Sequence, residues 1–309
     1  MKTENRIIWL DWLRVCACLM VMIVHSTEPF YLGGEGARIL TPTDAVWASF
    51  FDSFVRACVP LFIIASSYLL FPLQTSTGAF FRRRLSRLLV PFILWSLVYA
   101  FLWGEARWNA YGVFYYVSGF IGYLLLGLYF RRFVPEFTWL RTLLIALPTW
   151  FAGFVLCFGG FLVRAYATSQ SFPIEGPVDL AVGWETPWYN DTLGVALMTI
   201  GWVLIFRKFN RTLFSASSDA SDQQRFHIPA FQLSSVSKAS YGMYLCHMVV
   251  LAYASSFFRD WLGIANEGSL GLWTTPVEIL LTALTTFCLT ALVCTLLQRI
   301  PRLGKWIVG

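Results

Sequence analysis

Residues 7–25 read IIWLDWLRVCACLMVMIVH, an apolar run that is long enough to cross a lipid bilayer as a helix. The rest of the chain follows this pattern, since 57% of its 309 residues are hydrophobic and only 13% are charged. Its mean hydropathy of +0.62 lies far outside the range of soluble domains of this length. The composition therefore predicts an all-α, multi-pass transmembrane helical bundle that forms a single domain over residues 1–309.

About eight segments are apolar and long enough to span a membrane, taking roughly 20 residues as the requirement. They cover residues 7–25, 54–73, 88–103, 113–130, 142–163, 192–206, 240–258 and 277–298. The third and the sixth of these segments are the shortest. No connecting segment is long enough to hold a separate soluble domain, so any activity is expected to reside within the bundle.

Charged residues predict the orientation of the bundle. Placing the N-terminus and the C-terminus in the cytoplasm puts most of the Lys and Arg residues on inner loops, as membrane proteins prefer. The outer loops then hold most of the carboxylates and few arginines, among them Glu28, Asp44, Asp52 and Arg56. The net charge of +6 thus arises from basic residues in the cytoplasmic loops, where they can contact anionic lipid headgroups. We expect a membrane lipid environment and no nucleic-acid partner, because no soluble basic face is available.

The first span carries Asp11, Arg14 and His25, although a charge inside a bilayer costs about 2.5 to 3.5 kcal/mol on insertion scales. Arg14 and His25 are eleven residues apart, which places them on one helix face at roughly 16 Å. In one interpretation Asp11 and Arg14 form an ion pair at the inner interface, and His25 only caps the outer end. In the other, His25 is a general base that acts on a hydroxyl arriving from outside.

A basic cluster, FRRRLSRLLVPF at residues 81–92, precedes the third span and places Arg84 and Arg87 three residues apart. Arginines at an inner helix end are commonly a topology signal that contacts lipid headgroups. Alternatively they form a cytoplasmic phosphate clamp, because guanidinium groups bind phosphate oxygens through paired hydrogen bonds. Coenzyme A, with its three phosphates, is one ligand of that kind.

A polar stripe opens the seventh span, where SKASYGMYLCH occupies residues 237–247. Its members follow helical spacing and are Ser237, Ser240, Tyr244 and His247. The stripe predicts either hydrogen bonds between helices or contacts with a substrate. With this span starting at residue 240, His247 lies about 10 Å along its helix and His25 about 27 Å along its own. That difference in depth argues against a haem shared by the two imidazoles.

The seven cysteines lie within or beside apolar runs and form no C-x-x-C pair, so we expect neither a disulfide framework nor a metal site. The outer loops carry several tryptophans near the expected interfacial belt. Trp184 and Trp188 among them are interpreted as anchors or as rings that stack on a sugar. The outer-loop carboxylate of Glu105 is a further candidate contact with a glycan.

Taken together, these motifs resemble the membrane acyltransferase 3 family. The resemblance rests on D-x-L-R at residues 11–14 with a His eleven residues after the Arg, on VPLFIIASSYLL at 59–70, on the R-x-x-R within 81–92 and on SYGMYLCH at 240–247. Members of this family are typically inner-membrane enzymes that move an acyl group from acyl-coenzyme A to a sugar. The family usually has about ten spans, whereas here residues 91–100 run straight into 101–112, so two middle spans are expected to be missing.

The resemblance implies roles for particular residues. His25 would be the catalytic base, Arg14 a partner in the same channel, and Arg84 and Arg87 contacts of the acyl donor. In addition to what the resemblance implies, we expect Asp11 to hold Arg14 in place. Tyr244 and His247 lie in a typical motif without an implied role and are kept with Glu105 as candidate substrate contacts.

The expected function is transfer of an acyl group, with acetyl as the expected group, from cytoplasmic acyl-coenzyme A to a hydroxyl of a cell-surface or lipid-linked carbohydrate. The expected location is the bacterial inner membrane, and acetyl-coenzyme A is the expected donor, without a metal. Two alternatives remain open: a transporter or flippase for a lipid-linked sugar, and a non-catalytic membrane partner. Interrupted helices at matching positions of two halves of the chain would favour the transporter.

Overall fold

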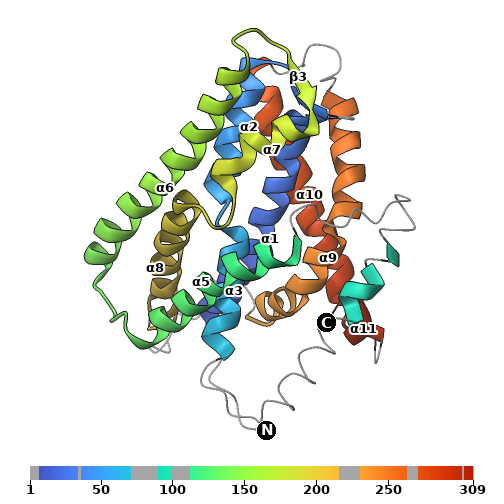
Figure 1. The fold of residues 1–309 in the computed structure, drawn as a ribbon. Coiled ribbons are helices and arrows are strands. Elements are labelled where there is room, and N and C mark those ends of the chain that lie inside the picture. The colour runs from blue at the N-terminus through green and yellow to red at the C-terminus, as the bar shows by residue number, and fades with distance from the viewer. Residues whose placement is uncertain are drawn as a thin grey trace.

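The structure is a computed structural model that describes residues 7–33, 36–70, 90–95, 97–98, 112–215, 230–262, 271–300 and 303–308. Its described elements are mostly helices, and α1 (Ile8–Thr27) runs up the centre of the bundle (Figure 1). The others, in chain order, are η1 (Glu28–Phe30), β1 (Leu32–Gly33), β2 (Gly36–Ile39), α2 (Pro42–Val55), α3 (Cys58–Leu70), α5 (Gly112–Arg132), α6 (Trp139–Thr168), β3 (Ile174–Pro177), α7 (Val178–Glu185), η2 (Thr186–Trp188), α8 (Leu193–Ser215), α9 (Ala230–Leu262), η4 (Gly271–Trp273), α10 (Thr274–Leu297) and α11 (Leu303–Ile307).

Five stretches of the described chain are long and apolar enough to cross a membrane. They are Ile8–Phe30, Pro42–Leu69, Trp139–Thr168, Leu233–Leu262 and Gly271–Leu297, and a pair bent by 45°, Val178–Trp188 with Leu193–Lys208, makes a sixth if it is counted as one broken span. The helical, multi-pass class predicted from composition therefore holds. Of the other two predicted segments, 113–130 coincides with α5, and half of 88–103 lies outside the described residues.

The second span starts earlier than residue 54, where the sequence interpretation placed it. Helix α2 begins at Pro42, which is well suited to the first turn because it has no N–H to satisfy there. The Thr41 side chain caps this helix by accepting a hydrogen bond from the Asp44 N–H. Asp52 and Arg56, which hydropathy had placed in an outer loop, lie on the inward face, where their opposite charges are paired. The apolar stretch continues through them into α3.

A small antiparallel sheet of order β1-β2-β3 caps the end of the bundle at the top of Figure 1, which the all-α interpretation did not anticipate. Its strands are only two to four residues long. Gly36 pairs with Pro177 beside Gly176, and a Cβ at Gly36 would come within 2.3 Å of the Gly176 carbonyl oxygen. Only glycine permits this close approach of the two backbones.

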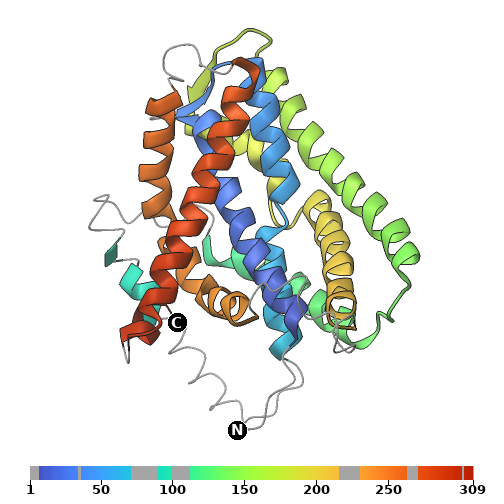
Figure 2. The same cartoon turned by 180° about the vertical axis from the view of Figure 1, so that it is seen from behind.

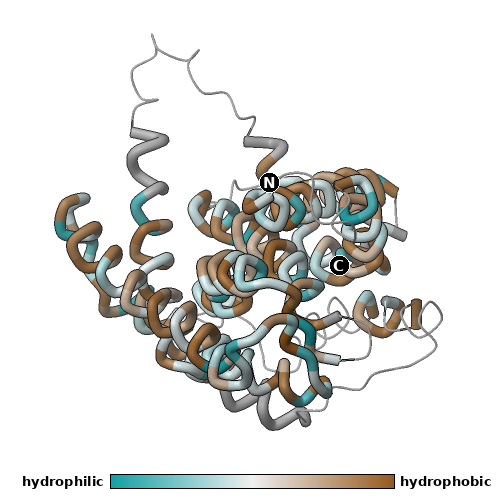
Figure 3. Tube along the Cα trace, turned by 90° about the horizontal axis from the view of Figure 1, so that it is seen from above, coloured by the Kyte–Doolittle hydropathy of each residue, from teal (hydrophilic) through white to brown (hydrophobic). Residues whose placement is uncertain are grey.

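Large apolar side chains cover much of the outer surface, as membrane lipid requires. Helix α6 is the clearest case, because only 17% of its most apolar window is buried. Its exposed side chains include Leu140, Leu144, Phe151 and Val163, each at least 60% exposed. Seen from above, hydrophobic residues lie on outward as well as inward faces of the helices (Figure 3). Contact of such a surface with lipid acyl chains is favourable, whereas its exposure to water is unfavourable.

Helix α1 is surrounded by α2, α3, α9 and α10, so its side chains lie at the centre of the packing. Figure 2 shows α1 between α10 and α2 from the rear. The described chain begins at α1 and ends after α11 at the same end of the bundle. Groups carried by the upper half of α1 can therefore meet groups from several other helices.

Mild oxidation with copper phenanthroline is expected to join Cys246 of α9 to Cys294 of α10. Their sulfur atoms lie 3.6 Å apart in the packed interior, so small side-chain rotations bring them to the bonding distance of about 2 Å. Peptide mass spectrometry after thiol labelling of the denatured protein measures the bridge. Cys288, which is exposed on α10, should remain labelled and serves as the control. Full labelling of Cys246 and Cys294 after oxidation would contradict the packing of α9 on α10.

Candidate functional site

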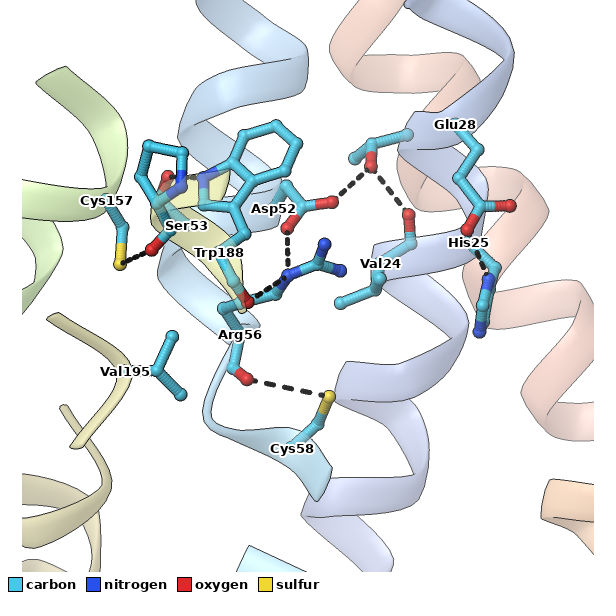
Figure 4. A network of polar contacts seen from close by, with 12 residues as sticks. Val24, His25, Glu28, Asp52, Ser53, Arg56, Cys58, Cys157, Trp188 and Val195 are labelled. Carbon is cyan, nitrogen blue, oxygen red and sulfur yellow. Dashed lines mark hydrogen bonds and ion pairs between the residues drawn. The ribbon is translucent and has the colours of Figure 1, made fainter. Parts of the chain in front are cut away.

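The last turn of α1 brings an imidazole and a carboxylate together. His25 lies near the end of α1, and Glu28 opens η1, which continues the same helical path, so the two side chains share a face. His25 Nδ1 lies 2.6 Å from Glu28 Oε1 (Figure 4). Because an ionised carboxylate only accepts hydrogen bonds, Nδ1 carries a proton, and in the neutral imidazole Nε2 then keeps its lone pair. Both side chains remain partly accessible, at 29% and 28%.

His247 of α9 faces this pair across the bundle. The ring centroids of His25 and His247 are 5.0 Å apart, with the planes tilted by 41°. His247 Nδ1 lies 2.5 Å from the carbonyl oxygen of Tyr244, one turn earlier in the same helix. Nε2 of His247 is buried and makes no hydrogen bond with any residue that the structure describes.

The depth predicted for His247 is wrong, because α9 begins at Ala230 rather than at residue 240. Both imidazoles therefore lie about 26 Å from the start of their own helices at 1.5 Å per residue. Depth does not separate them, contrary to the sequence interpretation. Their spacing is nonetheless too short for a shared haem, because an iron atom with ligand bonds of about 2 Å would hold the ring centroids further apart than 5.0 Å.

A buried ion pair at the end of α2 contacts α1. Asp52 Oδ1 lies 3.3 Å from Arg56 Nε on the same helix, with side-chain exposures of 0% and 16%. Asp52 Oδ2 also contacts the Thr27 hydroxyl of α1 at 2.9 Å. Arg56 Nε donates to the Trp188 carbonyl oxygen at 3.1 Å, as Figure 4 shows. The pair thus joins α1, α2 and η2 at Thr27, two residues after His25.

The two outer-loop tryptophans are structural. Trp184 and Trp188 are 1% exposed, and Trp188 stacks on Phe161 with centroids 4.3 Å apart. The Trp188 Nε1–H donates to Ser53 Oγ at 2.9 Å, and the Trp184 Nε1–H donates to Thr168 Oγ1 at 3.1 Å. Rings enclosed in this way cannot stack on a sugar, so that interpretation is wrong, as is their assignment as interfacial anchors.

Tyr31 follows η1 and is packed among the same aromatic rings, 5.5 Å from Trp188 between centroids. Burial raises the pKa of its phenol well above the ordinary value, and the negative charge of Glu185 raises this pKa further. The Tyr31 hydroxyl therefore keeps its proton at physiological pH and contributes no charge near Glu28.

Asp11 and Arg14 lie in the other half of α1. Asp11 is buried and accepts a hydrogen bond from Ser237 Oγ of α9 at 2.5 Å. Arg14 is half-buried one turn further on. The helical rise separates His25 from Arg14 by about 16 Å and from Asp11 by about 21 Å, so neither side chain contacts the imidazole. The polar stripe of α9 thus supplies an interhelical hydrogen bond at Ser237.

The remaining predicted site residues fall in two groups. Tyr244 is 38% exposed, and its ring lies 5.7 Å from His247 and 6.3 Å from Phe62 between centroids. Arg84, Arg87 and Glu105 lie outside the described residues. Within the described ranges no three His, Cys, Asp or Glu side chains are placed to hold a metal ion.

Sequence reasoning missed Glu28, Asp52 and Arg56 as parts of this site. Spacing did signal the first, because a carboxylate three residues after a histidine shares its face when the helix continues. The spacing also indicated the ion pair, since Asp52 and Arg56 are four residues apart and share a face of a helix. Hydropathy assigned all three to outer loops, and only the packing of α2 against α1 shows them inside.

Comparison with known families accounts for most of the chain. The acyltransferase domain of the acyltransferase 3 family matches residues 7–118 and 102–296. The groups around the imidazoles come from both stretches, with His25 and Asp52 in the first and Trp188 and His247 in the second. Neither the curated proteins nor the solved structures contain a match to this chain.

Proposed function

The chain belongs to the acyltransferase 3 family, and on this premise we propose that it transfers an acyl group, acetyl in the first instance, from cytoplasmic acyl-coenzyme A to a hydroxyl of a cell-surface or lipid-linked carbohydrate. The observation that carries the proposal is the imidazole of His25, whose Nδ1 is held by Glu28 and whose Nε2 forms no hydrogen bond within the described chain. A base so oriented and 29% accessible is suited to activating a hydroxyl.

In the proposed reaction, Nε2 of His25 removes the proton of the acceptor hydroxyl as its oxygen attacks the thioester carbonyl carbon. The tetrahedral intermediate then collapses with cleavage of the carbon–sulfur bond. The proton held on Nε2 passes to the departing thiolate, which gives coenzyme A as the free thiol. Glu28 keeps the proton of Nδ1 in place and stabilises the imidazolium that forms between the two steps. No covalent acyl-enzyme is required.

The donor is proposed to approach from the other end of the bundle. Arg84 and Arg87 would hold phosphate oxygens of coenzyme A through paired hydrogen bonds. Arg14 would orient the donor in the channel or stabilise developing negative charge. Asp11 supports this half of α1 through its hydrogen bond with Ser237. Location in a bacterial inner membrane would give the donor and the acceptor access from opposite faces.

A transfer assay tests the proposal. The full-length protein in nanodiscs is supplied with radiolabelled acetyl-coenzyme A and glycan acceptors, and both label transfer and release of the free thiol are followed. Stoichiometric transfer and release are expected. A protein that releases no thiol and modifies no acceptor would be a transporter or a non-catalytic partner instead. One bent helix pair is described, α7–η2 with α8, without the matching second interruption that a transporter of two halves would favour.

Replacement of Glu28 by glutamine is expected to lower kcat for acyl transfer by about 100-fold or more. The amide can donate to Nδ1, which moves the imidazole proton to Nε2 and removes the base. The comparison is Glu175→Gln, which neutralises an exposed carboxylate paired with Arg38 at the sheet and should leave kcat unchanged. Equal rates for the wild type and Glu28→Gln would contradict the orienting role of Glu28.

A further inference from the structure

Both imidazoles at the site are held in the same way. Nδ1 of His25 contacts the Glu28 carboxylate at 2.6 Å, and Nδ1 of His247 contacts the Tyr244 carbonyl oxygen at 2.5 Å. Carboxylate and carbonyl oxygens are acceptors, so each Nδ1 must carry its proton. In the neutral form each Nε2 therefore presents a lone pair and can only accept a hydrogen bond.

Neither lone pair is used by the described part of the protein. Nε2 of His247 is buried without a partner, and the His247 residue is only 4% exposed. The two histidines do not bond to one another, although their rings are 5.0 Å apart, because two acceptors cannot share a proton that neither carries. A buried acceptor without a donor costs about 1 to 3 kcal/mol, so such a group normally has an occupant that supplies one.

The proposed reaction supplies a hydrogen-bond donor to Nε2 of His25 but none to Nε2 of His247. The hydroxyl that becomes acylated donates to Nε2 of His25, which removes its proton. Nε2 of His247 needs a second donor at a distance set by two rings 5.0 Å apart. Two hydroxyls on neighbouring carbon atoms point outward from one short C–C bond, so each can direct its proton to a different one of two imidazoles whose ring centroids lie 5.0 Å apart. The half-exposed ring of Tyr244 lies beside His247, 5.7 Å between centroids, and offers a flat face next to them.

We propose that His247 binds a second hydroxyl adjacent to the one that is acylated, so that the enzyme selects acceptors carrying a vicinal diol, as a pyranose ring does. The inference rests on the proposed acyl transfer and deepens it. Nε2 of His247 accepts a hydrogen bond throughout the reaction, while its partner hydroxyl keeps its proton. His247 is thus a binding residue that selects the acceptor, and His25 is the base.

The test compares two small acceptors, trans-1,2-cyclohexanediol and cyclohexanol, with acetyl-coenzyme A and the full-length protein in nanodiscs. The wild type is expected to favour the diol by about 10-fold or more in kcat/KM, mainly through a lower KM, because the added hydroxyl meets a buried acceptor. His247→Phe should abolish the preference for the diol, so that the two acceptors are used with equal kcat/KM. His247→Gln should retain part of the preference, because its amide oxygen can accept in place of Nε2.

Each outcome decides between the inference and the proposed function. Equal use of the two acceptors by the wild type, or a preference that survives in His247→Phe, overturns the role of His247 and leaves acyl transfer standing. Absence of both product formation and thiol release in the wild type contradicts acyl transfer itself. If His247→Phe does not fold, the wild-type ratio and the His247→Gln variant still decide.

Discussion

Replacement of His25 by alanine is expected to lower the rate of acyl transfer by about 100- to 10,000-fold, the range that general-base catalysis contributes. The His25 imidazole has an oriented proton on Nδ1, its Nε2 meets no hydrogen-bond donor among the described residues, and its side chain is partly accessible. Without it the acceptor hydroxyl must attack the thioester while still carrying its proton. The effect should appear in kcat, because the base acts in the transition state.

The measurement is the initial rate of label transfer from acetyl-coenzyme A by protein in nanodiscs. Cys16→Ala, a half-buried change on the same helix, is the matched control and should keep the wild-type rate. Added imidazole should restore part of the activity of His25→Ala, since the small base can occupy the vacated space. A His25→Ala protein with the wild-type rate would remove the base from the mechanism.

Replacement of Asp52 by alanine is expected to destabilise the protein by about 3 to 5 kcal/mol, because it leaves the Arg56 guanidinium buried without its partner. The carboxylate is inaccessible and binds both Arg56 and the Thr27 hydroxyl. Loss of these contacts releases α1 from α2 at Thr27, two residues after His25. The midpoint of thermal unfolding in detergent should fall, and acyl transfer should fall with it.

Glu175→Ala provides the comparison, because it breaks an ion pair whose members are both more than half exposed. Such a pair contributes about 1 kcal/mol or less. The double variant Asp52→Leu with Arg56→Met should recover much of the lost stability, since an apolar pair of similar volume needs no charge compensation. Equal unfolding midpoints for Asp52→Ala and Glu175→Ala would show that the buried pair does not hold the bundle together.

Much of the molecule was predictable from local pattern. Apolar runs identified α1, α6, α9 and α10, and the polar residues of the first span identified His25. Four motifs in order along the chain identified the family, which the match over residues 7–118 and 102–296 confirms. The roles of Arg84 and Arg87 remain predictions.

Helix boundaries and interior charges were less predictable. Hydropathy treats every charge as a cost, so it started the second span only at residue 54 and assigned Asp52 and Arg56 to an outer loop. In the bundle the two charges neutralise each other on one face of α2, and the helix remains apolar towards its surroundings. The start of α9 was placed too late for the same reason, because Ser237 and Lys238 precede its apolar stretch.

The sequence alone determined that this is a helical membrane protein with an imidazole near one end of its first span, because a bilayer demands long apolar helices and makes every polar exception conspicuous. Only the tertiary structure decided what surrounds that imidazole. His247 lies 222 residues further along the chain than His25, and its ring reaches the site because α9 packs against α1. Helical periodicity predicts which residues share a face of one helix, but the side chains that meet between helices depend on how the whole bundle packs.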